Sequence, residues 1–196
     1  MSPEARALID PSAAFRQLMR EQGGGWWVAA RRPLRLLFVM GCVVSFQASG
    51  RLTARLIVDG AVSFAFIPVF ELASLAIVYW RRPQPISFAR ASDLFFAANA
   101  PWLVWLLGFV TLRSVQTPRQ ATALPLPLLW TLEVSLLAIA AWTFSIDRRF
   151  FREVLPRPDG RSDRDLLLQR AIAWSCGLWY FFGLAVWPEI AGRIFR

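Results

Sequence analysis

The fold of this chain is decided by residues 56–80, LIVDGAVSFAFIPVFELASLAIVYW, an apolar stretch that only Asp59 and Glu71 interrupt. A helix needs about 20 apolar residues to cross the roughly 30 Å hydrocarbon core of a bilayer, and this stretch is long enough. Three more runs of the same kind follow at residues 94–112, 124–146 and 171–190. We therefore predict an all-α fold, a helical bundle embedded in a membrane.

The composition agrees with a membrane environment. Of the 196 residues, 56% are hydrophobic and 18% are charged, against about 45–50% and about 25% in soluble domains. All 22 basic residues are Arg, the chain has no His, and 13 acidic residues leave a net charge of +9. The lack of His excludes His-ligated zinc or haem sites and catalytic pairs that use a His base.

A weaker run at residues 34–50 decides between four spans and five. It carries Arg35 near its start, from where an Arg side chain can extend to the headgroup layer. Counting this run as a span places 16 Arg on one side of the membrane and 6 on the other, whereas omitting it gives 12 and 10. Because short cytoplasmic loops are enriched in Arg and Lys, we predict five spans, a cytoplasmic N-terminus and an external C-terminus.

The segment before these spans, residues 1–30, is predicted to be a cytoplasmic amphipathic region ahead of a membrane domain over residues 31–196. Within residues 12–21, apolar side chains recur at helical spacing on one face, and Arg16 and Arg20 lie on another. Such a helix suits anionic lipid headgroups at a membrane surface. The alternative is an ordinary cap that packs on the rest of the protein.

The longest predicted loop, residues 147–170, contains seven Arg, among them Arg148, Arg149 and Arg152. These side chains can contact anionic lipids or an acidic partner at the cytoplasmic face, or they can serve only to orient the chain in the membrane. No nucleic-acid recognition motif accompanies them, so we expect no nucleic-acid partner.

Glu71 and Glu133 lie inside predicted spans, where an ionisable residue is a functional candidate. No Arg occurs at their depth in any predicted span, so we predict no ion-pair partner for either. Each is then protonated or hydrogen-bonded to polar neighbours, and forms either interhelical hydrogen bonds or a proton or cation site. Asp59, in contrast, is predicted to pair with Arg55 four residues earlier. The polar neighbours available to the two Glu are Ser74, Asn99, Thr131 and Ser135.

Two prolines are predicted to interrupt helices. Pro68 has no N–H to donate and so leaves the carbonyl of Phe64 without its helical partner, one turn before Glu71. Pro101 has the same effect close to Asn99. Broken helices next to polar groups occur in ion and substrate sites, and they also occur as simple kinks.

Three short segments carry a resemblance to a known family. Residues 87–90 (SFAR) lead into a span through residues 98–101 (ANAP), and residues 129–130 (LW) open the fourth span. With the cytoplasmic N-terminal segment and five spans, this layout resembles bacterial members of the Yip1-like membrane family. The resemblance implies a non-enzymatic integral membrane protein, and it brings no catalytic residue.

The sequence contains no nucleotide-binding, nucleophile-elbow or metal-ligand motif, so we expect no enzyme activity and no cofactor. We expect a non-catalytic scaffold or accessory subunit of a bacterial inner-membrane complex, whose partners are lipids and other membrane subunits or a second copy. The alternative is a small proton- or cation-linked transporter or channel that uses Glu71 and Glu133. A membrane enzyme ranks third.

Overall fold

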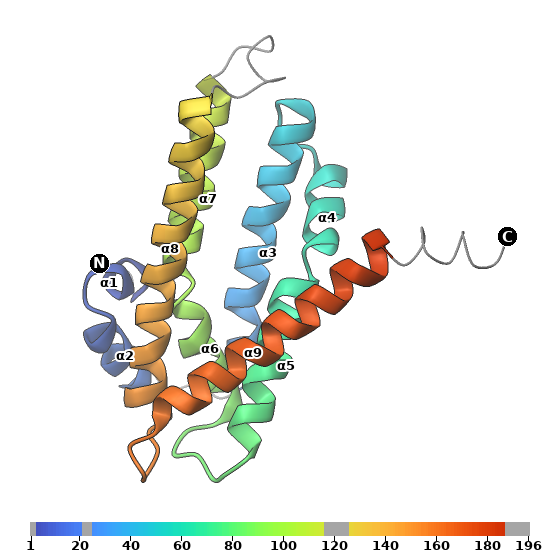
Figure 1. Cartoon of the computed structure of the whole chain (residues 1–196). Coiled ribbons are helices and arrows are strands. Elements are labelled where there is room, and N and C mark those ends of the chain that lie inside the picture. Colours follow the sequence, from blue (N-terminus) through green and yellow to red (C-terminus); the bar gives the residue numbers. More distant parts are fainter. Residues whose placement is uncertain (1–2, 21–24, 116–125, 187–196) are drawn as a thin grey trace, which may run out of the picture.

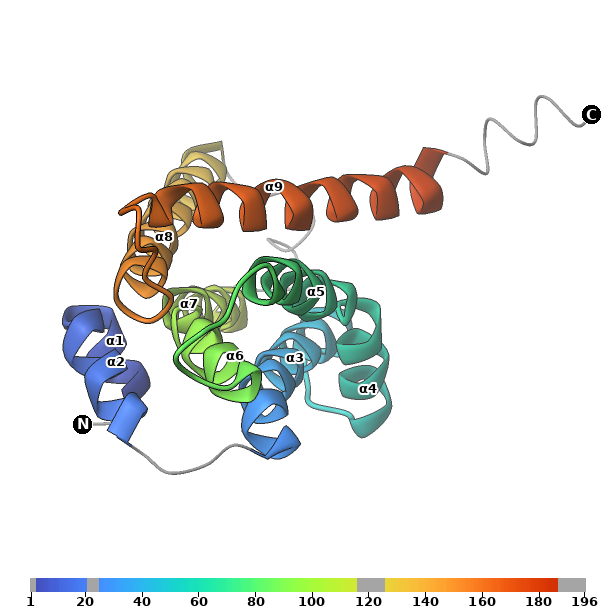
Figure 2. The same cartoon turned by 90° about the horizontal axis from the view of Figure 1, so that it is seen from below.

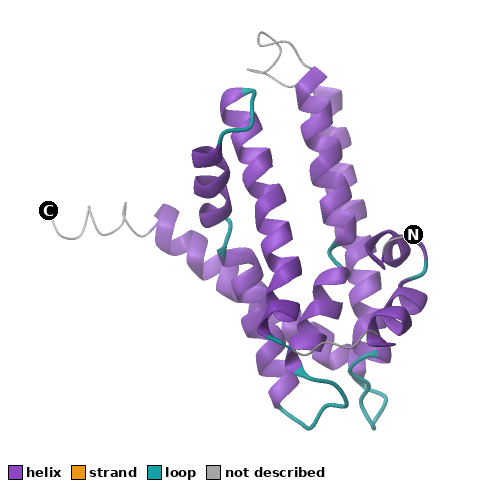
Figure 3. Ribbon diagram, turned by 180° about the vertical axis from the view of Figure 1, so that it is seen from behind, coloured by secondary structure: helices purple, strands orange, loops and turns teal. Residues whose placement is uncertain are grey.

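The computed structural model describes residues 3–20, 25–115 and 126–186, and in this part of the chain all regular structure is helical, as predicted (Figures 1 and 3). No strand occurs among these residues. The elements are α1 (Pro3–Ile9), α2 (Pro11–Arg20), α3 (Trp26–Ser49), α4 (Ala54–Ser63), α5 (Phe66–Trp80), α6 (Phe88–Ala97), α7 (Ala100–Val115), α8 (Leu126–Glu153), α9 (Ser162–Phe181) and the π-helix η1 (Phe182–Val186).

Three long helices, α3, α7 and α8, run along the length of the bundle, and α9 crosses obliquely over one side of it (Figures 1 and 2). α9 packs mainly on α5 and α8. The loops that join α5 to α6 and α8 to α9 lie at the same end, opposite the turn between α3 and α4 (Figure 1). We call the end with these two loops the basic pole, since Arg82, Arg152 and Arg157 lie there.

The helices α3, α4–α5, α6–α7, α8 and α9 overlap the five predicted apolar runs. By length and composition, α4 and α5 taken together as one helical segment, Ala54–Trp80, are able to cross a membrane. A second candidate is the pair α6–α7, which is bent by 43°. Only 28% of the most apolar window of Ala54–Trp80 is buried, whereas a core helix of a soluble protein that meets the same criteria is mostly buried. The described residues therefore include at least one membrane-capable helix.

The helix breaks fall where the prolines predict them. α4 ends at Ser63 and α5 begins at Phe66. Because Pro68 cannot donate to the carbonyl of Phe64, that carbonyl instead accepts from the N–H of Ile67 at 3.1 Å. The second break separates α6 from α7 just before Pro101.

Close contact between glycines joins α3 to α4. A Cβ atom at Gly41 would lie 2.2 Å from the carbonyl oxygen of Ile57, and one at Gly60 would lie 2.7 Å from the Cβ of Val44. Gly50 ends α3 with a φ of +67°, a left-handed conformation that glycine adopts without strain. The two helices can therefore approach closely only because these positions lack a side chain.

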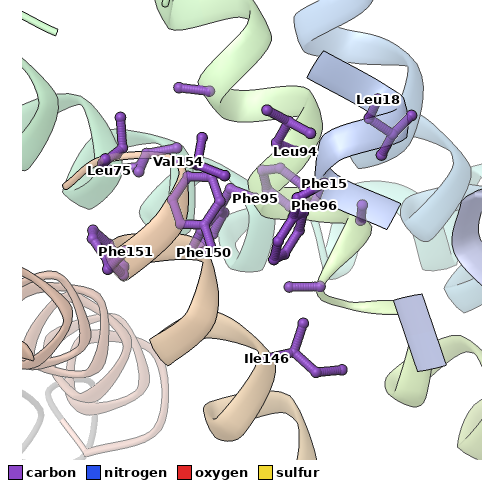
Figure 4. Packing of buried hydrophobic residues seen from close by; sticks show 14 of the residues in the cluster. Phe15, Leu18, Leu75, Leu94, Phe95, Phe96, Ile146, Phe150, Phe151 and Val154 are labelled. Carbon is purple, nitrogen blue, oxygen red and sulfur yellow. The ribbon is translucent and has the colours of Figure 1, made fainter. Parts of the chain in front are cut away.

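The core near the basic pole is aromatic (Figure 4). Phe15 of α2, Phe95 of α6 and Phe150 of α8 are at most 1% exposed. The ring of Phe150 lies 6.0 Å from that of Phe15 and 5.5 Å from that of Phe95, centroid to centroid. The apolar face of α2 thus packs on the protein, which is the cap alternative, while its basic face with Arg16 and Arg20 is exposed.

Large apolar side chains remain exposed away from the basic pole. We call residues 126–146 of α8, 171–181 of α9 and 182–184 of η1 the apolar half of these helices. In it, Leu137, Trp174 and Trp179 are 70%, 70% and 72% exposed. Large exposed apolar surfaces are uncommon on soluble monomers and often mark contacts with lipid or with another protein.

Candidate functional site

Arg170 of α9 binds two carboxylates that come from other helices. Its Nη1 lies 2.5 Å from Oε1 of Glu71 in α5, and its Nη2 donates to Oδ2 of Asp147 in α8. Its Cζ also lies 5.7 Å from the ring centroid of Phe95 in α6. We call Glu71, Arg170 and Asp147 the triad. It connects three helices at a point where the Asp147 side chain is 1% exposed and the other two are 18% exposed.

Gln169 extends the triad into the core. Its Nε2 donates to Oε2 of Glu71 at 2.5 Å and to Oγ of Ser74 at 3.0 Å. Ser74 in turn donates to the backbone carbonyl of Glu71 at 3.0 Å. Gln169 and Ser74 are both fully buried. Ser74 therefore lies beside Glu71 as predicted, but it reaches the carboxylate only through Gln169.

The prediction that Glu71 has no ion-pair partner is wrong. It rested on placing Arg170 outside the last predicted span, residues 171–190, whereas Arg170 lies within α9, which begins at Ser162. Because α9 crosses α5, Arg170 reaches Glu71 from 99 residues away in the sequence. An ion pair thus exists where hydrogen bonds from uncharged neighbours were expected.

Asp147 and Thr143 lie one turn apart on α8, and each has a buried oxygen without a hydrogen-bond partner. These atoms are Oδ1 of Asp147 and Oγ1 of Thr143; among the described residues, Oε1 of Gln169 is the other such atom. Buried polar atoms are normally hydrogen-bonded, so these oxygens are exceptions. Burial raises the pKa of Asp147 from 3.8 to about 6, although Arg170 acts to lower it.

The triad lies between two cavities on the two sides of α9. One, of about 640 Å³, lies among α7, α8 and α9 and is lined in part by Thr143, Asp147 and Arg170. The other, of about 460 Å³, lies between α5 and α9 and is lined in part by Glu71. Trp174 lines both cavities. Asp147 therefore lines one cavity and Glu71 lines the other, and the guanidinium of Arg170 binds both carboxylates.

The structure does not bring Glu133 to Glu71. Glu133 is exposed on α8, 14 residues before Asp147, which is about 21 Å along the helix at 1.5 Å per residue. Asn99 is half-buried in the turn between α6 and α7, where its backbone N–H donates to the carbonyl of Phe96 at 3.2 Å. Of the four predicted polar-site residues, only Glu71 and Ser74 lie together.

A second buried carboxylate, Asp93 of α6, binds three arginines. Arg31 of α3 forms a two-pronged contact, with Nε and Nη2 each 2.7 Å from a carboxylate oxygen. Arg32 lies 2.5 Å from Oδ2 and also donates to the backbone carbonyl of Asp93, and Arg90 lies 3.6 Å from Oδ2. Asp93 is fully buried. This cluster connects α3 to α6 at the basic pole.

Two of the three loop arginines proposed to contact lipid or a partner form ion pairs with an aspartate of the same chain. Arg148 and Arg152 of α8 lie 2.7 and 2.9 Å from Oδ2 of Asp163 in the first turn of α9. Their hydrogen bonds hold the pKa of Asp163 well below its usual range. Nearby, Asp165 binds both Arg82 and Arg157 at 2.8 Å. The arginines of this loop therefore fix the corner between α8 and α9.

The remaining predicted contact residues are exposed on the outer face of the basic pole. Arg149 lies with its Nη1 3.5 Å from Oγ of Ser12. Arg16 and Arg20 line a hollow of about 360 Å³ on α1 and α2, together with Arg6. These side chains can meet an anionic surface without rearrangement of the core.

Asp147 and Arg170 are the site residues that sequence reasoning missed. A usable signal was present, since Asp147 directly follows one apolar run and Arg170 directly precedes the next. Two runs joined by a short loop are antiparallel neighbours, so charges at the joined ends lie at the same level. No comparable signal pointed to Glu71 as their partner.

Comparison with protein-family models, with curated proteins and with solved structures gives no match for this chain. The resemblance to Yip1-like proteins is therefore an expectation from the sequence alone.

Proposed function

We propose that this chain is a non-catalytic, five-span protein of a bacterial inner membrane, which serves as a scaffold or accessory subunit for other membrane proteins or for a second copy of itself. One observation carries the proposal: large apolar side chains cover the outside of α8 and α9, while carboxylates and arginines are buried in ion pairs at one end. A lipid environment accounts for the first feature, because lipid tails are as apolar as the exposed side chains.

The positions of the arginines support the proposed orientation. The two loops of the basic pole and the adjoining helix ends contain Arg82, Arg148, Arg152 and Arg157. The opposite turn, between α3 and α4, has Arg51 and Arg55 beside it. By the positive-inside rule, the basic pole is then cytoplasmic.

The geometry favours a scaffold over the transport alternative. That alternative requires Glu71 and Glu133 to act together, but Glu71 is bound to Arg170 and Glu133 is exposed elsewhere on α8. Buried carboxylates that each bind arginines from other helices fix the arrangement of those helices. The exposed arginines Arg16, Arg20 and Arg149 then present positive charge to anionic headgroups or to an acidic partner.

Membrane extraction and co-purification test the proposal. After expression in a bacterium, the chain should remain in the membrane pellet at alkaline pH and then co-purify with another membrane protein, or with itself, in a mild detergent. The double variant R16E/R20E should lose this partner, whereas R55E, an exposed change at the opposite end, should keep it. A chain that purifies only as a solitary monomer contradicts the scaffold role, and release by alkaline extraction contradicts the membrane location.

Topology is tested separately with single-cysteine variants in a background in which Cys42 and Cys176 are changed to Ser. L52C lies in the turn between α3 and α4, and D159C lies in the loop between α8 and α9. In intact spheroplasts, an impermeant maleimide should label L52C and not D159C. Labelling of both from outside contradicts the five-span orientation.

A further inference from the structure

The cavity among α7, α8 and α9 has the size and lining of a small-molecule site. Its volume of about 640 Å³ is within the usual range of roughly 300–1,000 Å³ for ligand pockets. Its walls are mostly apolar, with Trp102 of α7 and Trp174 of α9 among them, and the small side chain of Ala140 leaves room between the helices. Thr143, Asp147 and Arg170 are its polar lining residues.

Two oxygens of the polar lining have no hydrogen-bond partner. Oδ1 of Asp147 and Oγ1 of Thr143 are both buried and unpartnered. An ionised carboxylate can only accept hydrogen bonds, and a hydroxyl oxygen accepts them readily. An occupant with an N–H or O–H group can therefore donate to Oδ1 of Asp147, and the hydroxyl of Thr143 can accept from the same group or donate to it.

The charge of the triad favours a cation as that occupant. Glu71 and Asp147 carry two negative charges when ionised, and Arg170 supplies one positive charge. Both Nη atoms of Arg170 already bind these carboxylates, so its positive charge is more than offset by two negative charges. A single positive charge would neutralise the triad, and a primary ammonium combines that charge with three donors.

The order of polar and apolar lining indicates how the occupant lies. Along α8 the lining runs from Ala140 to Asp147, and along α9 it runs from Trp174 back through Arg170 to Leu167. Asp147 lies nearer the basic pole than Ala140, and Arg170 lies nearer to it than Trp174, while the apolar Leu167 lies nearer still. Asp147 and Arg170 also lie just outside the predicted spans, at headgroup level. This arrangement matches a molecule with a cationic head and an apolar chain.

We propose that this cavity binds the primary ammonium of a phosphatidylethanolamine-type lipid, which donates to Asp147 and Thr143 while the apolar part lies along Trp102 and Trp174. The ammonium chemistry follows from the cavity itself. The assignment to a lipid, rather than to a free long-chain amine, rests on the proposed membrane location.

The test uses the full chain purified in a maltoside detergent, with retained lipid counted by native mass spectrometry. Phosphatidylethanolamine is compared with phosphatidylcholine of the same acyl chains, since the choline head has the same charge and no N–H donor. We expect about tenfold stronger retention of phosphatidylethanolamine, which corresponds to about 1.4 kcal/mol. Equal retention of the two lipids overturns the proposal.

Decylamine, added alone to the delipidated protein, tests whether the ammonium comes from a lipid or from a free long-chain amine. It should raise the melting temperature of the protein and compete with phosphatidylethanolamine. Stabilisation by decylamine without any retention of phosphatidylethanolamine overturns the lipid assignment. Because this arm needs no bilayer, it reports on the cavity even if alkaline extraction were to disprove the membrane location.

Two variants localise the site. D147N removes the negative charge and should lower the preference for phosphatidylethanolamine about tenfold, to the level of phosphatidylcholine. Since D147N also alters the triad, A140F provides a test that leaves the triad intact, because it fills the cavity from its apolar wall. The matched control is A138F, the same substitution at an exposed position of α8. A preference that survives A140F in a folded protein overturns the proposal.

Discussion

The basic pole and the apolar half are stabilised by different kinds of interaction. At the pole, Asp93, Asp147 and Asp165 are buried, and each binds at least one Arg from another helix or loop. In the apolar half, Leu137 and Trp179 face outward, and no ion pair joins two residues of this half in the part of the chain that the structure describes. One end therefore depends on specific charge pairing, and the other depends on the medium that surrounds it.

This difference indicates which changes will matter. A buried charge that loses its partner is strongly destabilising, whereas an exposed ion pair contributes little. We therefore expect substitutions at the pole to act on stability, and changes of the medium to act on the apolar half. Each of the following experiments changes one of the two regions and measures the effect on stability or on the bound lipid.

Removal of Arg170 should have the largest effect. R170M leaves Glu71 and Asp147 without their shared cation and should lower the free energy of unfolding by about 3–5 kcal/mol. The measurement is reversible unfolding in mixed micelles. The matched control is R55M, which breaks the exposed pair with Asp59 at 3.7 Å and should cost at most about 1 kcal/mol.

A variant in which all three triad side chains are uncharged distinguishes the loss of ion pairing from the loss of packing. If charge is the cause, R170M/E71Q/D147N should recover most of the stability that R170M loses, because no unpaired charge remains buried. An R170M variant as stable as R55M would remove the distinction between the pole and the exposed surface.

The pH dependence of stability tests the burial of Asp147. Burial raises its pKa from 3.8 to about 6, while Arg170 of α9 lowers it and Glu71 of α5 raises it. A pKa that is higher in the folded chain than in the unfolded chain stabilises the fold fully below the unfolded value, and this stabilisation is lost as the pH rises through about 6.

We therefore expect the free energy of unfolding of the wild type, relative to D147N, to fall between about pH 4 and about pH 7, by up to about 3 kcal/mol. A difference that does not change with pH contradicts the burial of an ionisable Asp147.

Helix contact through glycine should give a smaller effect. G41A places a Cβ atom 2.2 Å from the carbonyl oxygen of Ile57, and overpacking of this kind typically costs about 1–3 kcal/mol. G177A meets no atom within 4 Å and should instead gain up to about 1 kcal/mol from helix propensity. Thermal unfolding of the two variants in one detergent compares them directly; equal stability contradicts the close contact between α3 and α4.

Charge changes on the outer face of the pole should affect stability least. R16E/R20E alters exposed side chains outside the buried ion pairs, so the melting temperature should hardly change. Retention of phosphatidylglycerol should fall, by about 1 kcal/mol for each Arg removed from an anionic surface. A large drop in melting temperature without loss of this lipid would give Arg16 and Arg20 a structural role instead.

Local features of the fold could be predicted from the sequence, and long-range pairing could not. The apolar runs and the breaks before Pro68 and Pro101 follow from residues close together in the chain. The partner of Glu71 does not, because Arg170 is 99 residues away and reaches it only when α9 crosses α5. For the same reason, the apolar face of α2 was predictable, but its packing on Phe150 was not.

The most direct test is to measure whether lipid or water surrounds the apolar half. Spin labels at L137C and D159C, in a background with Cys42 and Cys176 changed to Ser, can be compared in proteoliposomes for access to oxygen and to a water-soluble nickel complex. The account predicts that the label at position 137 meets oxygen and not nickel, and that the label at position 159 meets nickel. Equal access of nickel to both positions would contradict it.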